Sequence, residues 1–551
     1  MLVFFGAFFL WPIWQVLQGG FQDASGFTLA YVIEVFRNPI YLEGLRNAFG
    51  VAIFSTGGAL LISLPLAFMA DRYTFPLKKI FMGAALLPIM LPPFVGAIGV
   101  KQIFGQFGAF NAFLQHVGLL ESGQVIDWIG RGQFWGVVFV SAFSLYPILY
   151  LNAVASLSNI DPAREEAAEN LGCRGWKRFF KITLPLMRPG LFAGCTIVFI
   201  WSFTELGVPL IFDYSRMTSV QIFYGIKDIG GNPFPYALVS VMLFFSILFY
   251  ALGKGLFGRN TFSMMAKASH AGEARRPGWM GQAFCTGFFF LITFIALLPH
   301  LGVVLISFAG DWYNSLLPET WTLRNFELAL GHNLTVNSIR NSLFYAAMAT
   351  MLNIVIGVCI AYVVVRTRLP GRNLLDTMAM LPLAVPGLVM AFGYLAMSQE
   401  GKFFDFMNAV ENPVALLIIA YAVRKLPFVV RSAVAGLQTT SETYEEAAQN
   451  LGAPPLKTAF KITIPLIMAN LLAGGLLAFS QSMLEVSDSL ILAQKSQFYP
   501  ITKAIYELMQ FLGDGRYIAS ALGVWAMAFL AVTILAASGL LGKKLGAIFR
   551  I

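Results

Sequence analysis

The stretch from Glu165 to Pro185, EEAAENLGCRGWKRFFKITLP, returns from Glu445 to Pro465 as EEAAQNLGAPPLKTAFKITIP. Each copy contains Glu-Ala-Ala, three residues, a glycine, nine residues, and then Ile-x-Leu-Pro or Ile-x-Ile-Pro. Matched positions in the two copies are always the same distance apart, so the chain contains an internal duplication. The matched residues are Glu166, Ala167, Ala168, Gly172, Ile182, Leu184 and Pro185 in the first copy, and Glu446, Ala447, Ala448, Gly452, Ile462, Ile464 and Pro465 in the second.

The composition of this motif predicts a pair of short helices. Glu and Ala are good helix formers, and a glycine suits a tight turn between two helices. Pro185 and Pro465 are expected to stop the second, amphipathic helix of each pair. Long apolar runs flank both copies, so we expect each polar helix pair to lie at a membrane surface.

The whole chain is far too apolar for a soluble globular protein. Of its 551 residues, 58% are hydrophobic and only 12% are charged, and the mean hydropathy is +0.72. A helix of about 20 apolar residues crosses the roughly 30 Å of a bilayer's hydrocarbon core. We therefore predict an all-α polytopic membrane protein with about 12 transmembrane helices, near residues 2–18, 47–70, 80–104, 133–157, 190–212, 235–257, 282–308, 341–365, 376–397, 412–437, 471–493 and 517–541.

The two halves of the chain are predicted to be parallel repeats of six helices, because six is even and both helix pairs must face the same side. Arg72 and Arg366 are also matched between the halves, although with a slightly larger offset than the helix pairs. The first half therefore has extra residues, which fit best in an outer loop after the third predicted helix. The predicted parts are a first repeat over residues 1–257, a cytoplasmic linker over 258–281 and a second repeat over 282–551.

The charge distribution predicts the orientation in the membrane. The net charge is +9, and most Lys and Arg residues lie on the side of the two helix pairs, which places that side and both termini in the cytoplasm. The positive charge therefore indicates topology and contact with the lipid bilayer, and no nucleic-acid partner is expected. The N-terminal sequence lacks a basic segment and a cleavage pattern, so we expect a retained first span. The four cysteines are isolated, and no metal site is expected.

Two kinds of intramembrane residue are candidates for a translocation path. Prolines, including Pro92 and Pro386, are expected to break the third and ninth helices, and such breaks are tolerated where the backbone faces protein or water. Kinks that serve packing alone are an equally good explanation.

Ionisable residues in the fifth, tenth and eleventh predicted helices form the second group: Glu205, Glu485, Asp488, Arg424 and Lys425. Such residues are costly in a membrane and commonly face a protein interior or a cavity. We expect Glu485 to be held by Arg424 or Lys425, and Glu205 to lie on the path. A purely structural role for the two glutamates remains open.

The duplicated motif resembles the coupling loop, or EAA loop, of the membrane subunits of bacterial ATP-binding-cassette importers. With both repeats fused in one chain, the sequence looks like the permeases of the ferric-iron, thiamine and 2-aminoethylphosphonate group. The resemblance implies a permease of the bacterial inner membrane that works by alternating access. It also implies two copies of a cytoplasmic ATPase, which bind ATP and Mg, and an extracytoplasmic solute-binding protein.

The chain itself contains no GxxxxGK[ST] phosphate-binding loop and is therefore not expected to be an enzyme or to hold a cofactor. The resemblance favours ferric iron as the solute, by its frequency in the group. The alternatives are 2-aminoethylphosphonate, a phosphate ester, thiamine or a polyamine. A gradient-driven secondary transporter is the alternative from another class, although it would not explain the doubled motif.

Overall fold

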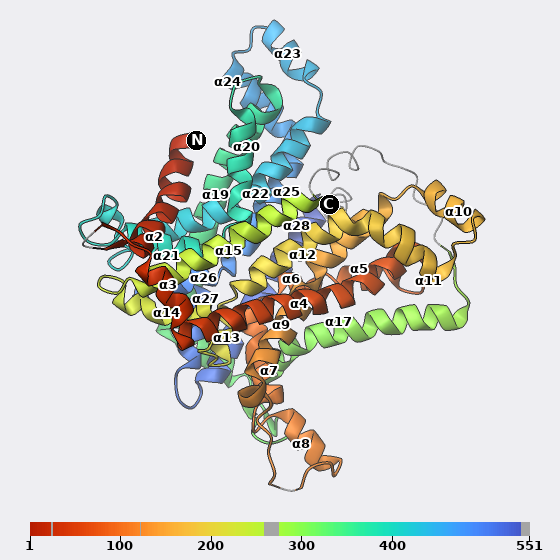
Figure 1. Ribbon diagram of the computed structural model, residues 1–551, viewed down its shortest axis with the longest axis vertical. Coiled ribbons are helices and arrows are strands. Elements are labelled where there is room, and N and C mark those ends of the chain that lie inside the picture. The colour runs from red at the N-terminus through yellow and green to blue at the C-terminus, as the bar shows by residue number, and fades with distance from the viewer. Residues whose placement is uncertain (24–25, 122, 258–274, 542–551) are drawn as a thin grey trace. The chain divides into compact units, whose positions relative to one another are not determined.

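The computed structural model describes residues 1–23, 26–121, 123–257 and 275–541. Most of the linker predicted at 258–281 therefore lies outside the described residues. Helices dominate the described chain, as Figure 1 shows. Its two small antiparallel sheets pair β1 (Gln22–Asp23) with β2 (Gly26–Phe27) and β3 (Ala309–Asp311) with β4 (Thr320–Trp321).

The described helices confirm an all-α membrane protein. Nine of them, each taken with any directly continuous segment, are long and apolar enough to cross a membrane. Two further helix pairs qualify together but bend by 93° and 101°. Helix α22 (Val414–Thr439) is also long enough to span but carries three basic residues. These elements together correspond to the twelve predicted segments.

The chain forms two compact units. The first unit comprises Asn38–Gln221 and Phe244–Asn325, and contains the first copy of the motif. The second unit comprises Met1–Arg37, Ile222–Leu243 and the described residues from Phe326 onward, and contains the second copy. Three helices, α14, α15 and α18, run across unit boundaries.

In the first unit, the long helix α4 packs against α9 and α12, while α17 packs against α7. Buried aromatic and aliphatic side chains, including Tyr146 of α9 and Phe289 of α17, form a shared core. The helices are α4 (Pro39–Arg72), α5 (Lys78–Ala84), α6 (Leu87–Met90), α7 (Pro93–Phe104), α8 (Ala109–His116), α9 (Trp128–Ser158), α10 (Pro162–Asn170), α11 (Gly175–Arg178), η2 (Phe179–Thr183), α12 (Leu184–Phe203), α13 (Gly207–Ile211), α17 (Trp279–Phe308) and parts of α14 (Thr218–Gly225) and α15 (Phe234–Phe257). The short η3 (Ile226–Asp228) belongs to the second unit.

In the second unit, α19, α22 and α25 pack together, while α2 packs against α21. Besides α22, its helices are α1 (Leu2–Phe5), η1 (Gly6–Leu10), α2 (Trp11–Phe21), α3 (Ala30–Arg37), α18 (Arg324–Gly331), α19 (Asn333–Arg366), α20 (Arg372–Met380), η5 (Leu381–Leu383), α21 (Gly387–Met397), η6 (Asp405–Met407), α23 (Thr443–Asn450), α24 (Pro455–Thr458), η7 (Ala459–Thr463), α25 (Ile464–Met483), α26 (Ser487–Leu492), η8 (Ser496–Phe498), α27 (Ile501–Met509) and α28 (Gly515–Leu541).

The first helix of each sequence half packs in the unit that contains most of the other half. A Cβ atom on Gly99 of α7 would lie 1.9 Å from the Pro299 carbonyl oxygen of α17. The matched Gly393 of α21 approaches Pro12 of α2, where a Cβ atom would lie 2.8 Å from the carbonyl oxygen. Both crossings therefore need a glycine. The repeat boundaries predicted from sequence describe the duplication and stay a prediction, because the compact units cut across them.

Proline-rich breaks interrupt the third and ninth predicted spans, as expected. Leu91 and Pro92 are extended between α6 and α7, and Pro386 is extended immediately before α21. The fifth and eleventh spans are broken as well. Their helices stop after Phe203 and Met483 and resume at α13 and α26.

Candidate functional site

The first copy of the motif folds into helix α10, a tight turn, and a second helix that begins with α11. The Asp161 side chain caps α10 by accepting a hydrogen bond from the Ala163 N–H at 3.0 Å. Gly172 follows α10 with φ +81°, in the left-handed region that favours glycine. The Cys173 N–H then donates to the Ala168 carbonyl at 2.8 Å, which closes the turn.

The second copy repeats this geometry. Gly452 follows α23 with φ +85°, and the Ala453 N–H donates to the Ala448 carbonyl at 3.0 Å. The prediction that Gly172 and Gly452 lie in the turn between two helices is therefore confirmed. Pro454 and Pro455 begin the next helix, where a missing N–H costs no helical hydrogen bond.

The expected stop at Pro185 and Pro465 is wrong. One π-helical turn, η2 or η7, precedes each proline, and the chain then continues directly into α12 or α25. The wider π turn leaves room for the proline ring, which would otherwise clash with the carbonyl four residues earlier. Ile182 and Ile462 lie in these π turns, and Leu184 and Ile464 are the first residues of the membrane helices.

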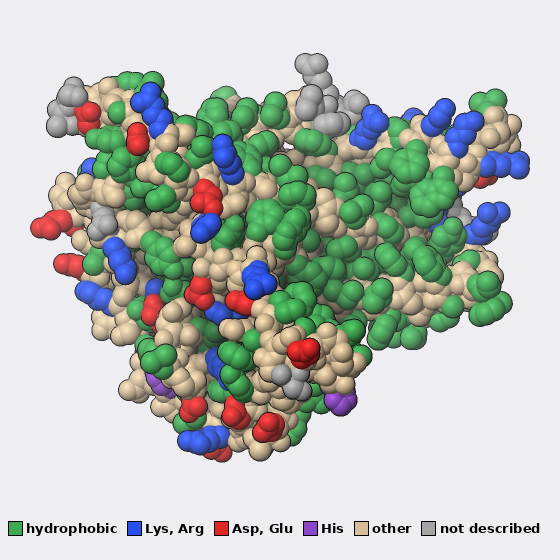
Figure 2. Space-filling view, turned by 60° about the horizontal axis from the view of Figure 1, so that its bottom comes forward, with side chains coloured by type: hydrophobic (Ala, Val, Ile, Leu, Met, Phe, Trp, Pro, Cys, Tyr) green, Lys and Arg blue, Asp and Glu red, His purple; other side chains and the backbone are tan. Residues whose placement is uncertain are grey.

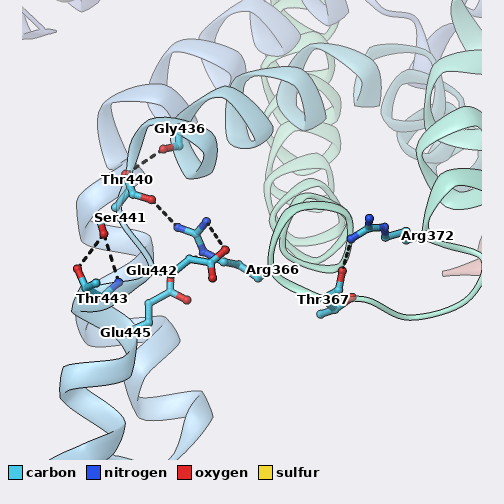
Figure 3. A network of polar contacts seen from close by, with 9 residues as sticks. All are labelled: Arg366, Thr367, Arg372, Gly436, Thr440, Ser441, Glu442, Thr443 and Glu445. Carbon is cyan, nitrogen blue, oxygen red and sulfur yellow. Dashed lines mark hydrogen bonds and ion pairs between the residues drawn. The ribbon is translucent and has the colours of Figure 1, made fainter.

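One buried glutamate fastens each short helix to a long membrane helix. Arg72 at the end of α4 contacts Glu165 of α10 at 2.6 Å, and Arg366 at the end of α19 contacts Glu445 of α23 at 3.2 Å. Figure 3 shows the Arg366 side chain turned toward the start of α23. Sequence reasoning missed these glutamates because it selected their neighbours Glu166 and Glu446, which are both exposed.

Each helix pair exposes large apolar side chains among its charged ones. Leu171 is 87% exposed and the matched Leu451 is 90% exposed. Two aromatic or aliphatic side chains of the second helix join each leucine. We call these matched sets the exposed trios; they are Leu171, Trp176 and Phe180 in the first unit, and Leu451, Leu456 and Phe460 in the second.

The surroundings of the helix pairs are consistent with a membrane boundary. In the first unit, α10 and α11 lie at the end of α4 and α12 opposite to α13 (Figure 1). The face in Figure 2 has a broad hydrophobic area on the right, and Lys and Arg side chains gather along its upper and right edges. Basic residues at the rim of an apolar belt are typical of a membrane–water interface.

A buried cluster of four charges lies in the second unit. Arg424 of α22 forms an ion pair with Glu485, and the adjacent Lys425 contacts the other Glu485 oxygen at 2.8 Å. Asp488 of α26 lies 3.4 Å from Arg424 and is fully buried. The predicted pairing of Glu485 with Arg424 or Lys425 is therefore confirmed. The cluster balances two positive and two negative charges away from water.

Glu205 lies at the matched break of the first unit in a different environment. It is partly exposed, and its carboxylate accepts a hydrogen bond from the Val208 N–H at 3.2 Å, at the start of α13. Its backbone carbonyl accepts one from the Ser219 hydroxyl at 2.6 Å. Whether Glu205 faces a translocation path stays a prediction.

A polar side chain lies close to the backbone at each proline break. The imidazole Nε2 of His300 lies 3.4 Å from the Pro92 carbonyl oxygen. After Pro386, Gly387 lies against the Arg424 guanidinium, and a Cβ atom there would be 2.1 Å from Arg424 Nη1. Gly387 therefore makes room for the Arg424 side chain of the charge cluster, a contact that the sequence analysis did not predict.

In the part of the chain that the structure describes, no group of three or more His, Cys, Asp and Glu side chains could hold a metal ion. The absence of a resident metal or cofactor stays a prediction.

Several known proteins with similar sequences are permease proteins of transport systems. The ferric transport system permease protein FbpB of Actinobacillus pleuropneumoniae is 28% identical over 506 residues, which cover 88% of this chain and 69% of that protein. The Fe(3+)-transport system permease protein FbpB 2 of Haemophilus influenzae is 23% identical over 493 residues, 89% of this chain and 88% of that protein. A half-length relative, the molybdate/tungstate permease WtpB of Pyrococcus furiosus, is 28% identical over 216 residues, 39% of this chain and 82% of that protein.

The duplication is also visible at the level of the family. Residues 63–261 and 353–542 each match the family described as the binding-protein-dependent transport system inner membrane component. Both matched regions contain one helix pair and one broken span with its glutamate. The chain is therefore a fused, double-length permease, and it belongs to the family of binding-protein-dependent transport system inner membrane components.

Proposed function

We propose that this chain is the permease subunit of an ATP-driven importer of ferric iron. The observation that carries the proposal is the match along nearly the whole chain to permeases of ferric transport systems. As a permease, the chain is not itself an enzyme. ATP and Mg would be bound, and ATP hydrolysed, by a separate ATPase.

The two helix pairs would be the docking sites for two copies of a cytoplasmic ATPase. Both pairs have the same turn geometry, and both expose an apolar trio, which water alone does not favour. Docking against a protein groove would bury these trios. The exposed motif residues Glu166, Ala167, Glu446 and Ala447 would contribute to the same surface. In this proposal the helix pairs and both termini would lie in the cytoplasm, and an extracytoplasmic solute-binding protein would act on the other side.

The translocation path would be lined by residues at the breaks in the membrane helices. The candidates are Glu205, Glu485, Asp488, Arg424, Lys425, Pro92 and Pro386. Carboxylate oxygens suit a hard, highly charged cation such as ferric iron. Ferric iron would be the cargo and not a resident metal.

The anionic alternatives, 2-aminoethylphosphonate or a phosphate ester, rest on Arg424 and Lys425. Both cations already contact Glu485, and Arg424 also contacts Asp488. Charge alone therefore does not favour an anionic solute at the cluster. Thiamine and polyamines gain no specific support from the described contacts. A gradient-driven secondary transporter is disfavoured by membership of a binding-protein-dependent family.

The test is uptake by proteoliposomes that contain this chain together with its ATPase and its solute-binding protein. We expect ferric-iron uptake that needs ATP and the binding protein and does not respond to a proton or sodium gradient alone. Molybdate, sulfate, putrescine, thiamine and 2-aminoethylphosphonate are the competing solutes. ATP-dependent uptake of one of these without iron uptake would replace the proposed solute, and gradient-driven uptake without the ATPase would overturn the transport mechanism.

A further inference from the structure

The two long membrane helices α4 and α19 end in the same way. Each has 34 residues, and each ends with an arginine, Arg72 or Arg366. These arginines contact α10 and α23, which we call the coupling helices. The Arg366 side chain is only 5% exposed, and its partner Glu445 is 7% exposed. Arg72 is 25% exposed, although its partner Glu165 is only 5% exposed. The Arg366–Glu445 pair therefore lies largely out of water, where breaking an ion pair is costly, and the Arg72–Glu165 pair is half-buried.

The ion pair is the main point at which each coupling helix is anchored. Glu445 is the only buried residue of α23, and α10 buries only Glu165 and Ala168. The other residues of both helices are exposed or half-buried. Each short helix also contacts the second helix of its own pair, which continues into α12 or α25. The ion pair is the separate contact through which a force on the exposed face reaches α4 or α19.

Further hydrogen bonds fix the direction of each contact. Arg366 also donates to the Thr440 carbonyl at 2.8 Å and lies 3.5 Å from Glu442, so it holds the chain just before α23 (Figure 3). In the first unit, Arg72 contacts Oε2 of Glu165, and the Thr183 hydroxyl donates to Oε1, the other carboxylate oxygen, at 2.6 Å. Glu165 is thus held between the end of α4 and the π turn η2.

We propose that the Arg72–Glu165 and Arg366–Glu445 ion pairs are positioning contacts that transmit the movement of each coupling helix to α4 and α19. The proposal rests on the proposed docking of an ATPase to these helices. Arg72 and Arg366 touch neither the solute nor ATP in this scheme. They act through the coupling helices, and their loss separates ATP hydrolysis from transport.

The experiment measures solute taken up per ATP hydrolysed by the reconstituted full complex. For Arg366→Glu and for Glu445→Arg, we expect this ratio to fall about tenfold, within the usual range of coupling between sites, while the ATPase stays bound. The double variant Arg366→Glu/Glu445→Arg restores the pair with opposite polarity and should recover most of the ratio. Arg368→Glu, which changes an exposed arginine two residues away, is the control and should keep the wild-type ratio.

Two milder variants, Thr183→Val and Thr463→Val, provide a second test if the charge variants do not fold. Thr183→Val removes a hydrogen bond to Glu165 and should lower the ratio about threefold or more, as loss of a hydrogen bond to a charged group does. Thr463→Val is its counterpart at the matched position, where the hydroxyl has no hydrogen-bond partner among the described residues, and should change nothing.

Three outcomes overturn the proposal: a wild-type ratio in Thr183→Val, equal losses in the two threonine variants, or a folded double charge variant that is no better coupled than the single ones. Loss of the ATPase from folded Arg366→Glu would also overturn it, because the contact would then serve docking itself. If the wild-type chain binds no ATPase, the proposed function fails instead, so the two failures are distinguishable.

Discussion

Replacing Glu485 with Gln removes one of the two negative charges of the buried cluster. The isosteric amide keeps the volume of the side chain and leaves Arg424 and Lys425 facing Asp488 alone. Glu485 is only 6% exposed, and it is the only carboxylate within ion-pair distance of Lys425 among the described residues. The substitution therefore leaves an uncompensated positive charge in the second unit.

The expected loss of stability follows from this geometry. Removing one partner of a buried ion pair typically costs about 3–5 kcal/mol. The Arg424 side chain is 20% exposed, so its charge is partly screened, and we take a value of about 3 kcal/mol at the lower end of that range. At about 2–4 °C per kcal/mol for a unit of this size, Glu485→Gln should lower the unfolding temperature by about 6–12 °C.

The assay is thermal unfolding of the purified chain in detergent, with Glu205→Gln as the matched control. The Glu205 carboxylate accepts a backbone hydrogen bond that a Gln carbonyl oxygen can also accept. We expect Glu205→Gln to unfold within about 2 °C of wild type, a change of under about 1 kcal/mol. Its uptake should nevertheless fall if Glu205 lies on the path.

A compensated variant sharpens the same prediction. Glu485→Gln combined with Lys425→Met restores equal numbers of positive and negative charges in the cluster. Replacing both members of a buried ion pair is often close to neutral, so the double variant should regain most of the lost stability. Equal stability of Glu485→Gln and wild type, or an equal loss in Glu205→Gln, would refute the reasoning.

Three further predictions concern the turns, the partners and the helix crossings. Gly452→Val should stop solute uptake while membrane insertion and expression stay normal, because a β-branched residue is strained at φ +85°; normal uptake would count against a coupling role. Native mass spectrometry of the intact complex should show two ATPase subunits for each copy of this chain, and any other ratio contradicts the two docking sites. Gly99→Ala should destabilise the first unit by about 1–3 kcal/mol in thermal unfolding, because its Cβ meets the Pro299 carbonyl, whereas Gly83→Ala, with open space around it, should not; equal effects would argue against the crossing.

Features that depend on local sequence were predictable. Apolar runs of the right length located the membrane helices, and glycine after a run of helix formers located both tight turns. The pairing of Glu485 with Arg424 and Lys425 was also predictable, because charges at similar depth in a low-dielectric interior need one another. All three are properties of single segments or of depth in the membrane.

Features that depend on contacts between distant segments were not predictable in the same way. Arg72 and Glu165 are matched to Arg366 and Glu445, but the two pairs of positions have different offsets between the halves. No single repeat spacing therefore connects each arginine to its glutamate. The packing of each half's first helix against the other half has an even weaker sequence signal. An apolar helix has no sequence pattern that identifies its neighbour.

The continuation of the helices through Pro185 and Pro465 shows a third kind of limit. Proline normally ends a helix because its ring clashes with the preceding turn. Here one π turn absorbs the clash in both halves, and the membrane helix starts without a gap. The sequence rule failed because it assumed ordinary α-helical geometry before the proline.

The two broken spans share one feature and differ in another. Both have a hydroxyl that donates to the backbone carbonyl at the break, but among the described residues only the second has a buried charge cluster. Each break leaves a backbone carbonyl that must be satisfied: Ser219 donates to the carbonyl of Glu205 at 2.6 Å, and Thr502 donates to that of Glu485 at 2.7 Å. An unsatisfied buried carbonyl would cost about 1–3 kcal/mol in either unit, so this solution is duplicated. The charge cluster is not, because Ser144 occupies the position that matches Arg424. The helix break alone therefore does not account for the cluster, and its costly buried charges answer a requirement that only the second unit has.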